Sequence, residues 1–566
     1  MKITSTQIDH LGLVSGVFDR LGIGEVIDSR LRKCRHHKVP HSSATKAMVL
    51  NGLGLMGQRL YLYPEYYEKV PVSKLIGGDI QSSDLNDDVL GATLDAIYHY
   101  GPTELFNEIV LEIMNHEDLG SQLLHADTTS FDVQGEYESD DDERKSIEIT
   151  LGHSKDGRMD LKQFVLSMVS NQHGIPIFVQ AHSGNSSDKK TIIEAIRRVK
   201  EGLNFNDDTY FVADSALYSY ENINHLGENI SWITRVPATI SDAKDLLDAD
   251  IEMKPCKDDR YSCHIFLSSY GGIEQRWVMF HSRPMQERME KSFQKRLEKD
   301  TRSSQVDLNK FMRREFACEA DARKQAEIWL DQHPFHKLVD LDIVTKCKRA
   351  GQKRGRPKKG EDMVTVYLVL ARLEINKEIL EEAHHKLGRF ILASNDTEID
   401  PDTLLGYYKG QQSVERGFRF LKDKQFRVAE VYLKKEERIE ALAMIMVLCL
   451  LVYSFAEWMI RKGLKQNGQF VPDQKGKPTQ RPTLKWICFL FYGVAEVTVE
   501  IGNEVHREIA NLKDYMIIVI RILGKKCEKY YEWRRNSGMS GTSEAKFVYY
   551  STRERTYRKL YLFHCE

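Results

Sequence analysis

SQLLHADTTSFDV, residues 121–133, is a strand candidate that carries an acidic residue, Asp127, near its centre. Apolar and β-branched residues fill most of the stretch, which predicts a buried strand. A carboxylate inside such a strand is costly unless it is paired or binds a metal. The stretch therefore predicts a functional acid on a core strand. The alternative is an acid with only a hydrogen-bonding role at a strand end.

The segments that follow predict a single α/β core. Two strand candidates, residues 161–171 and 175–183, are joined by the turn sequence Asn-Gln-His-Gly. Helix and strand candidates then alternate through residues 191–203, 208–217, 220–229 and 230–237. Three antiparallel strands followed by alternating helices and strands are typical of the ribonuclease-H arrangement. We therefore predict the α/β class with a ribonuclease-H-like core.

The length of 566 residues predicts about three to four domain-sized units. Helical patterns dominate the start of the chain, and further strand candidates flank a charged helical stretch between residues 238 and 400. We predict a β-rich insertion there, which interrupts the core. The expected units are a helical N-terminal domain (1–119), the first part of the core (120–237), the insertion (238–400), the end of the core (401–460) and a helical C-terminal region (461–566). The N-terminal domain is expected to bind DNA; a packing or dimerisation domain is the alternative.

Two further acids extend the set begun by Asp127. Asp214 ends an apolar strand candidate in YFVADSALYS (210–219), where the alternative role is a helix N-cap. Glu415 lies in LLGYYKGQQSVERGFRFLKDKQF (404–426). Phosphodiester chemistry with two Mg²⁺ ions needs carboxylates that converge on metals about 3.5–4 Å apart. Asp127, Asp214 and Glu415 are therefore predicted as catalytic residues and as ligands of two Mg²⁺ ions, with Mn²⁺ as a substitute.

The residues around Glu415 have a regular spacing. Tyr408, Gln411, Glu415 and Lys422 follow one another at three, four and seven residues. On one helix these spacings place the four side chains on roughly one face. Such a face, with a carboxylate among polar and cationic groups, suits a phosphate backbone that crosses a metal site. The alternative is an ordinary amphipathic helix.

This stretch resembles the Y-x2-R-x3-E-x6-K signature of a large family of bacterial insertion-sequence DDE transposases. Tyr408, Glu415 and Lys422 match, whereas Gln411 stands where the family has arginine. HADTTSF and FVADSALYS are similar to the two Asp blocks of the family. GHSKDGRMDLKQF is similar to a segment found between these blocks in one subgroup.

The resemblance implies cut-and-paste movement of an insertion sequence. Water activated by the metal would nick DNA at the end of the element, and the released 3′-hydroxyl would attack a second strand; a hairpin intermediate also occurs in this family. Double-stranded DNA, as terminal inverted repeats and as target, is the implied partner, and a homodimer would bridge two ends. No nucleotide cofactor is expected, which agrees with the lack of a P-loop pattern.

Several basic and polar residues are predicted to contact DNA. Tyr408 and Lys422 would hold phosphates near the metals. In KRAGQKRGRPKK (348–359) the Arg-Gly-Arg-Pro core is similar to a hook for the minor groove, and a solvated basic loop is the alternative. The remaining candidates are Gln411, Arg416, Arg419, Arg354 and Arg356.

Composition limits the other possibilities. The net charge is −2, so a DNA-binding surface must concentrate its cations locally. Nine cysteines without a C-x-x-C pair favour reduced thiols in a cytoplasmic, nucleoid-associated protein. The apolar run ALAMIMVLCLLVYSFA (441–456) is shorter than the roughly 20 residues of a membrane span. It predicts a buried core helix.

Other features have ordinary explanations. The acidic run ESDDDE (138–143) is expected to be a solvated loop. His125 and His153 are expected to be structural or to contact DNA, and Trp277 to be a core residue. Two other functions remain open: a non-catalytic DNA-binding protein derived from a transposase, and a ribonuclease-H-like nuclease that cuts without joining.

Overall fold

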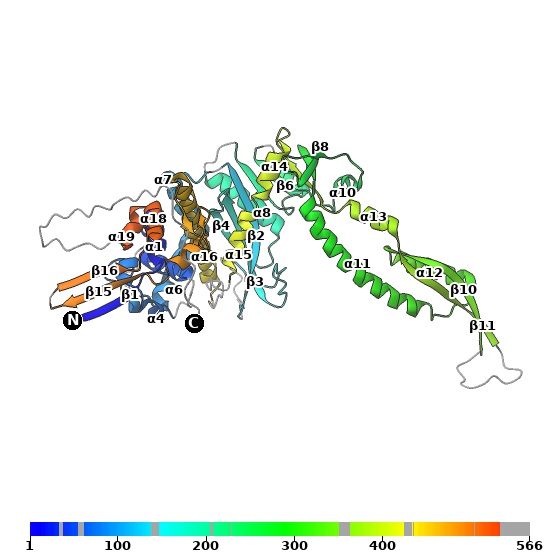
Figure 1. The fold of residues 1–566 in the computed structure, drawn as a ribbon, viewed down its shortest axis with the longest axis horizontal. Helices are drawn as coiled ribbons and strands as arrows, with labels where there is room; N and C mark the ends of the chain where they lie inside the picture. The colour runs from blue at the N-terminus through cyan, green and yellow to red at the C-terminus, as the bar shows by residue number, and fades with distance from the viewer. Residues whose placement is uncertain are drawn as a thin grey trace, which may run out of the picture.

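The computed structural model describes the whole chain except residues 33–37, 55–61, 121, 136, 138–146, 204–207, 228, 350–362, 424–432, 434, 503 and 532–566. Figure 1 shows an elongated molecule with a helical part at one end, a large sheet in the middle and a long arm at the other end. The first and last described elements lie together in the helical part.

The described residues form a nine-stranded mixed sheet at the centre, in the order β4-β3-β2-β5-β6-β12-β9-β8-β7. The strands are β2 (Leu123–Val133), β3 (Lys162–Asn171), β4 (Pro176–Ser183), β5 (Tyr210–Ala213), β6 (Ser231–Arg235), β7 (Lys254–Pro255), β8 (Tyr261–Tyr270), β9 (Ile273–Ser282) and β12 (Arg389–Ser394). The predicted α/β class is confirmed.

The first five strands follow the predicted chain order. β2, β3 and β4 are antiparallel neighbours, and β5 and β6 then run parallel to β2. The helices between these strands are α8 (Asp188–Gly202), α9 (Tyr220–Leu226) and, beyond β6, α10 (Ser241–Asp248). α8 packs on β2, β3 and β4, because its apolar residues repeat at helical spacing on one side.

The strands predicted for the insertion extend the same sheet. β12 pairs with β6 on one side and with β9 on the other. The strands of the predicted insertion (238–400) therefore do not form a separate sheet, because β7, β8, β9 and β12 belong to the central one. Sequence patterns predict that a strand forms, but the partner of a strand is chosen by packing between segments far apart in the chain. Trp277 on β9 is 1% exposed, as expected for a core residue.

A separate arm is built from the middle of this region. It consists of α11 (Arg283–Phe311), α12 (Glu319–Asp331), the antiparallel pair β10 (His336–Arg349) and β11 (Met363–Ile375), and α13 (Lys377–His385). A small apolar cluster that includes Phe311 and Trp329 holds the arm together. Figure 1 shows that the arm points away from the sheet. β10 was not predicted, because charged residues interrupt its apolar pattern.

Helices from both ends of the chain pack into one body. The N-terminal ones are α1 (Leu11–Arg20), α2 (Ile23–Arg30), α3 (His41–Leu53), α4 (Tyr63–Tyr67), α5 (Val72–Leu75), the 3₁₀ turn η2 (Ser82–Asp84), α6 (Asp87–Tyr100) and α7 (Pro102–His116). The C-terminal ones are α16 (Glu436–Gln466), α17 (Leu484–Leu490), α18 (Asp514–Leu523) and α19 (Lys525–Tyr531). The predicted N-terminal helices are confirmed.

The C-terminal region is not entirely helical, which corrects the prediction. β15 (Ala495–Ile501) pairs with β16 (Glu504–Ala510) and, on its other edge, with β1 (Lys2–Gln7). A short pair, β13 (Val471–Pro472) and β14 (Pro478–Thr479), precedes them. The alternation of polar and apolar residues in AEVTVEI, followed by Gly502, is typical of a hairpin strand and explains the difference.

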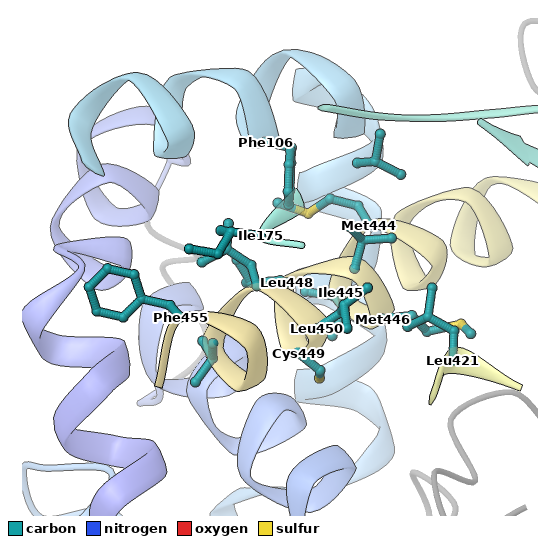
Figure 2. Packing of buried hydrophobic residues seen from close by; sticks show 14 of the residues in the cluster. Phe106, Ile175, Leu421, Met444, Ile445, Met446, Leu448, Cys449, Leu450 and Phe455 are labelled. Atoms are coloured by element: carbon teal, nitrogen blue, oxygen red, sulfur yellow. The ribbon is translucent and has the colours of Figure 1, made fainter. Parts of the chain in front are cut away.

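The long apolar helix α16 lies at the centre of the helical body. Among the described residues it is the one helix long and apolar enough to cross a membrane, but 83% of its most apolar window is buried inside the protein. Figure 2 shows its side chains, Met444 to Phe455, packed among Phe106, Ile175 and Leu421. The predicted core helix is confirmed.

Candidate active site

The pairing of β2 with β5 brings two of the predicted acids together. Ala126 on β2 pairs with Ala213 on β5 in parallel register. Asp127 and Asp214 each follow one of these paired residues. Neighbouring strands lie about 4.8 Å apart, so the two aspartates leave the paired region side by side.

Asp127 is a half-buried acid among other charges. Its Oδ1 accepts a hydrogen bond from the backbone N–H of Thr128 at 2.7 Å. Burial raises the pKa of Asp127 to about 7; the Lys155 ammonium opposes this, whereas the negative charges of Asp214 and Glu415 add to it. Asp214 and Glu415 therefore both lie within electrostatic reach of Asp127.

Asp214 shapes the turn that follows β5. Its Oδ1 accepts the N–H of Ala216 at 2.9 Å, and its main-chain oxygen accepts the hydroxyl of Thr234 on β6 at 2.7 Å. The N-cap of the next helix is instead Ser219. Asp214 is therefore held at the strand end and does not cap α9.

The third acid lies on a helix that crosses β2 and β3. α14 (Pro401–Lys409) and α15 (Gln412–Leu421) are two helices separated by a tight turn at Gly410. Glu415 lies in the first turn of α15 and is exposed. The prediction that all four signature residues share one face of a single helix is wrong, because the stretch forms two helices and Gln411 between them is buried whereas Glu415 is exposed.

Gln411 lies at the break and points inward. It is 6% exposed; its Nε2 donates to the main-chain oxygen of Ala126 at 3.0 Å, and its Oε1 lies 3.4 Å from Nδ1 of His125. The predicted contact between Gln411 and DNA does not fit this buried, bonded amide. The side chain instead joins the α14–α15 break to β2 directly before Asp127.

The break passes unusually close to β2. A Cβ atom at Gly410 would lie 2.6 Å from Nε2 of His125, so only glycine fits between helix and strand. His125 is fully buried, and burial lowers its pKa to about 4. The expectation of a structural role for His125 agrees with this position. His153 is exposed on the nearby loop.

Tyr408 and Lys422 flank the acids. Burial raises the pKa of Tyr408; Arg235 opposes this, and the charges of Asp214, Glu415 and Asp127 add to it, so the phenol lies within electrostatic reach of all three. Lys422 Nζ is 2.7 Å from Asp156 Oδ2 and lies over the ring of Phe131.

The other predicted DNA contacts divide into two groups. Arg416 and Arg419 are exposed on α15, and both follow Glu415 along the helix. Arg354 and Arg356 lie outside the described residues, and so does the acidic run 138–143.

Two cations near the acids were not predicted. Lys155 Nζ donates to the main-chain oxygen of Thr128 at 2.7 Å and lies 3.2 Å from Asp188 Oδ2, beside a hollow of about 470 Å³. Arg235 lies at the end of β6, near Tyr408. A sequence signal existed for Lys155, since it belongs to the GHSKDGR segment, but its position against β2 depends on the fold.

The donor set suits a hard divalent cation. All three acids offer carboxylate oxygens, and a cation would stabilise the charge on Asp127 that burial and the neighbouring Asp214 and Glu415 disfavour. Within the described part of the chain, no three His, Cys, Asp or Glu side chains are grouped as a complete ligand set. Mg²⁺ does not require one, because it keeps several waters and uses few protein ligands together with substrate phosphates.

The mixed sheet places Asp127 on β2 beside the end of β5, which Asp214 follows, and α15, with Glu415 in its first turn, packs on β2. Residues 120–452, more than half of the chain, match the family model described as "Transposase DDE domain". The chain therefore belongs to the DDE transposase family, whose members move insertion sequences by DNA transposition. Residues 3–111 match a second model, described as a domain of unknown function (DUF4277). No curated protein matches the chain.

Proposed function

We propose that this transposase moves its element by cut-and-paste transposition, with Asp127, Asp214 and Glu415 as the catalytic acids. The observation that carries the proposal is that the Ala126–Ala213 register places Asp127 and Asp214 side by side and that Glu415 lies within electrostatic reach of Asp127. We further propose that β2 to β6, with α8, α14 and α15, form a ribonuclease-H-like core. The Y-x2-Q-x3-E-x6-K arrangement is then the local form of the family signature.

The three acids would hold two Mg²⁺ ions, with Mn²⁺ as a substitute. When bound, these ions supply a nucleophile at neutral pH and stabilise charge on the leaving oxygen. The protein contributes position: Lys155 holds the backbone of β2 beside Asp127, and Gln411 holds the α14–α15 break against the same strand. Tyr408 and Lys422 are proposed to orient DNA phosphates at the site.

The reaction has two parts: hydrolysis of one phosphodiester, and then transesterification, which exchanges one phosphodiester for another. First, a water oxygen bonds to phosphorus at the element's end, the bond to the 3′-oxygen breaks, and this oxygen leaves as a 3′-hydroxyl. Second, the oxygen of that hydroxyl bonds to a phosphorus of another strand, either the opposite strand, which gives a hairpin, or the target. The bond from that phosphorus to its own 3′-oxygen breaks, and this oxygen leaves as a new 3′-hydroxyl. No nucleotide cofactor is needed for either part.

The proposed partners are double-stranded DNA, as terminal repeats and target, and a second copy of the chain. Residues 1–119 are proposed to recognise DNA, although the α1–α7 helices also pack against α16, α18 and α19. The cationic segment that contains Arg354 and Arg356, together with exposed Arg416 and Arg419, is proposed to add phosphate contacts.

The test uses labelled DNA that carries the element's own terminal repeats, with Mg²⁺. Wild type is compared with Glu415→Gln and with the matched control Glu398→Gln, whose side chain is 91% exposed. We expect end-specific 3′ nicking and joined products from wild type and Glu398→Gln, and neither product from Glu415→Gln.

Other outcomes separate the remaining functions. Cleavage without joined products would favour a ribonuclease-H-like nuclease. Tight end binding without cleavage by any of the three proteins, in Mg²⁺ or Mn²⁺, would favour a non-catalytic DNA-binding protein.

A further inference from the structure

A pocket of about 830 Å³ lies on the other side of α15 from Glu415. We call it the α15–α16 pocket; it is lined by Arg416 and Phe420 of α15, Trp458, Lys462 and Lys465 of α16, and Arg481 of the segment before α17, with further residues between them. The α15 residues that line it, such as Ser413, Arg416, Gly417 and Phe420, recur at helical spacing and form one face. The pocket is thus one helix diameter, about 10 Å, from the proposed catalytic acid.

The charges on this pocket are strongly unbalanced. Five cations line it and the lining includes one acid, Glu457. That acid is already engaged: Arg461 lies 2.7 Å from its Oε1, and its Oε2 accepts the N–H of Leu484. In the described structure Arg416, Lys462, Lys465 and Arg481 have no ion pair with a carboxylate. Four positive charges that share one hollow repel one another, so an anion would be bound favourably there.

Aromatic rings lie beside the cations. The ring of His173 stacks on Trp458 with centroids 5.3 Å apart, and Lys462 Nζ lies 4.5 Å from the centre of the Trp458 ring. These three residues also line a second hollow, of about 530 Å³, that continues past Gln122 to Asp118. The two hollows together make an extended path, whereas a site for a small anion would draw its cations to one point.

Cations interleaved with aromatic rings along a path are typical of surfaces that bind a nucleic-acid strand. The net charge of the chain is −2, so this concentration of positive charge is local. Arg416 directly follows Glu415 in α15, which connects the pocket to the proposed site of cleavage. A strand that leaves the reacting phosphate across α15 would meet Arg416 first.

We propose that the α15–α16 pocket binds the sugar–phosphate backbone of the DNA strand that flanks the reacting phosphate. This inference rests on the proposed function for the identity of its ligand. The cations would contact successive phosphates, and the His173–Trp458 pair would support the sugar or base that lies between them.

The test measures binding separately from cleavage. A fluorescein-labelled terminal-repeat duplex with a single-stranded flank is titrated without divalent metal, in a series of salt concentrations, with inorganic pyrophosphate as a competitor. The double variant Lys465→Glu/Arg481→Glu is compared with wild type and with Lys244→Glu, a charge reversal of an exposed lysine on α10. Thermal unfolding confirms that all three proteins are folded.

We expect the double variant to bind the duplex on the order of ten- to a hundredfold more weakly and to lose about one to two units of salt slope. Lys244→Glu should bind like wild type. A single variant, Lys465→Gln, keeps the test valid if the double variant fails to fold, and should show a smaller loss in the same direction.

Three outcomes would overturn the proposal: wild-type affinity in the folded variants, an equal loss of affinity in Lys244→Glu, or DNA binding that stays unchanged at pyrophosphate concentrations that saturate the protein. These results are independent of the cleavage assay. If the double variant loses affinity but wild type never cleaves, the pocket is a DNA site and the proposed catalysis is wrong. If Glu415→Gln abolishes cleavage and the double variant binds DNA like wild type, the proposed catalysis stands and the pocket is not a DNA site.

Discussion

The side-chain amide of Gln411 donates a hydrogen bond to the main-chain oxygen of Ala126 over 3.0 Å. Ala126 directly precedes Asp127, and Gln411 lies four residues before Glu415. This bond therefore joins β2, which carries Asp127, to the break between α14 and α15 that precedes Glu415. A neutral, hydrogen-bonded amide suits this buried position, whereas a guanidinium there would leave donors without partners.

Gln411→Ala is expected to lower the rate of DNA cleavage by more than tenfold while costing about 1–2 kcal/mol of folding stability. The reason is that Ala126 and His125 lose their partner and Glu415 loses its fixed position relative to Asp127. Single-turnover cleavage and thermal unfolding measure the two effects. Gln412→Ala, an exposed neighbour of the same type, is the control and should change neither. Equal losses in both variants would contradict a positioning role.

Gly410→Ala tests the close approach of helix and strand. A methyl group would lie 2.6 Å from His125 Nε2, so the break must move away from β2 and take Glu415 with it. We expect a destabilisation of about 1–3 kcal/mol and loss of cleavage. Gly406→Ala is the matched control, because nothing lies within 4 Å of its Cβ position in α14. That variant should be neutral or stabilised by about 0.5–1 kcal/mol. A silent Gly410→Ala would show that the approach is not required.

Asp127→Asn tests whether Asp127 binds the metal, through its effect on folding stability. In the absence of metal and above about pH 7, the substitution removes a charge that burial disfavours and that Asp214 and Glu415 repel, so the unfolding midpoint should rise. Wild type should gain stability when Mg²⁺ is added, because the ion binds only the folded site, and the variant should gain less. Differential scanning calorimetry with EDTA or with Mg²⁺ gives both comparisons. An equal gain from Mg²⁺ in the two proteins would remove Asp127 from the metal site.

Local patterns predicted much of the fold and the candidate acids. The apolar strands around Asp127 and Asp214, the helices of the first 116 residues and the buried helix α16 all have periodicities that depend only on neighbouring residues. Asp127 could be singled out because an acid in an apolar strand requires an explanation. The spacing of Tyr408, Glu415 and Lys422 added the third acid.

Other features depend on contacts that no local pattern contains. The pairing of β12 with both β6 and β9 joins segments more than a hundred residues apart, so the insertion strands could not be placed in the central sheet. Gln411 lies between α14 and α15 and points inward. The regular spacing of the signature residues predicted one continuous helix, so this break could not be foreseen. Lys155 reaches the site because its loop packs back against β2, and Arg235 because β6 lies in the same sheet as β2.

Glu440, in the second turn of α16, provides a test of pH dependence away from the acids. Burial raises its pKa to about 7; the N–H of Ile147 opposes this, and the charges of Glu104 and Glu437 add to it. The folded protein therefore binds a proton at Glu440 between about pH 4.5 and pH 7 that the unfolded chain releases. Stability from this residue is present at low pH and falls as the pH rises towards 7.

Glu440→Gln should remove that dependence. We expect the variant to be about 1–2 kcal/mol more stable than wild type at pH 8 and no more stable at pH 4.5, where both side chains are neutral. Urea unfolding at a series of pH values gives the difference directly. Glu201→Gln, on the exposed side of α8, is the control and should show no such trend. A constant difference between wild type and Glu440→Gln across the pH range would mean that the carboxyl is ionised throughout, with its charge compensated within the fold.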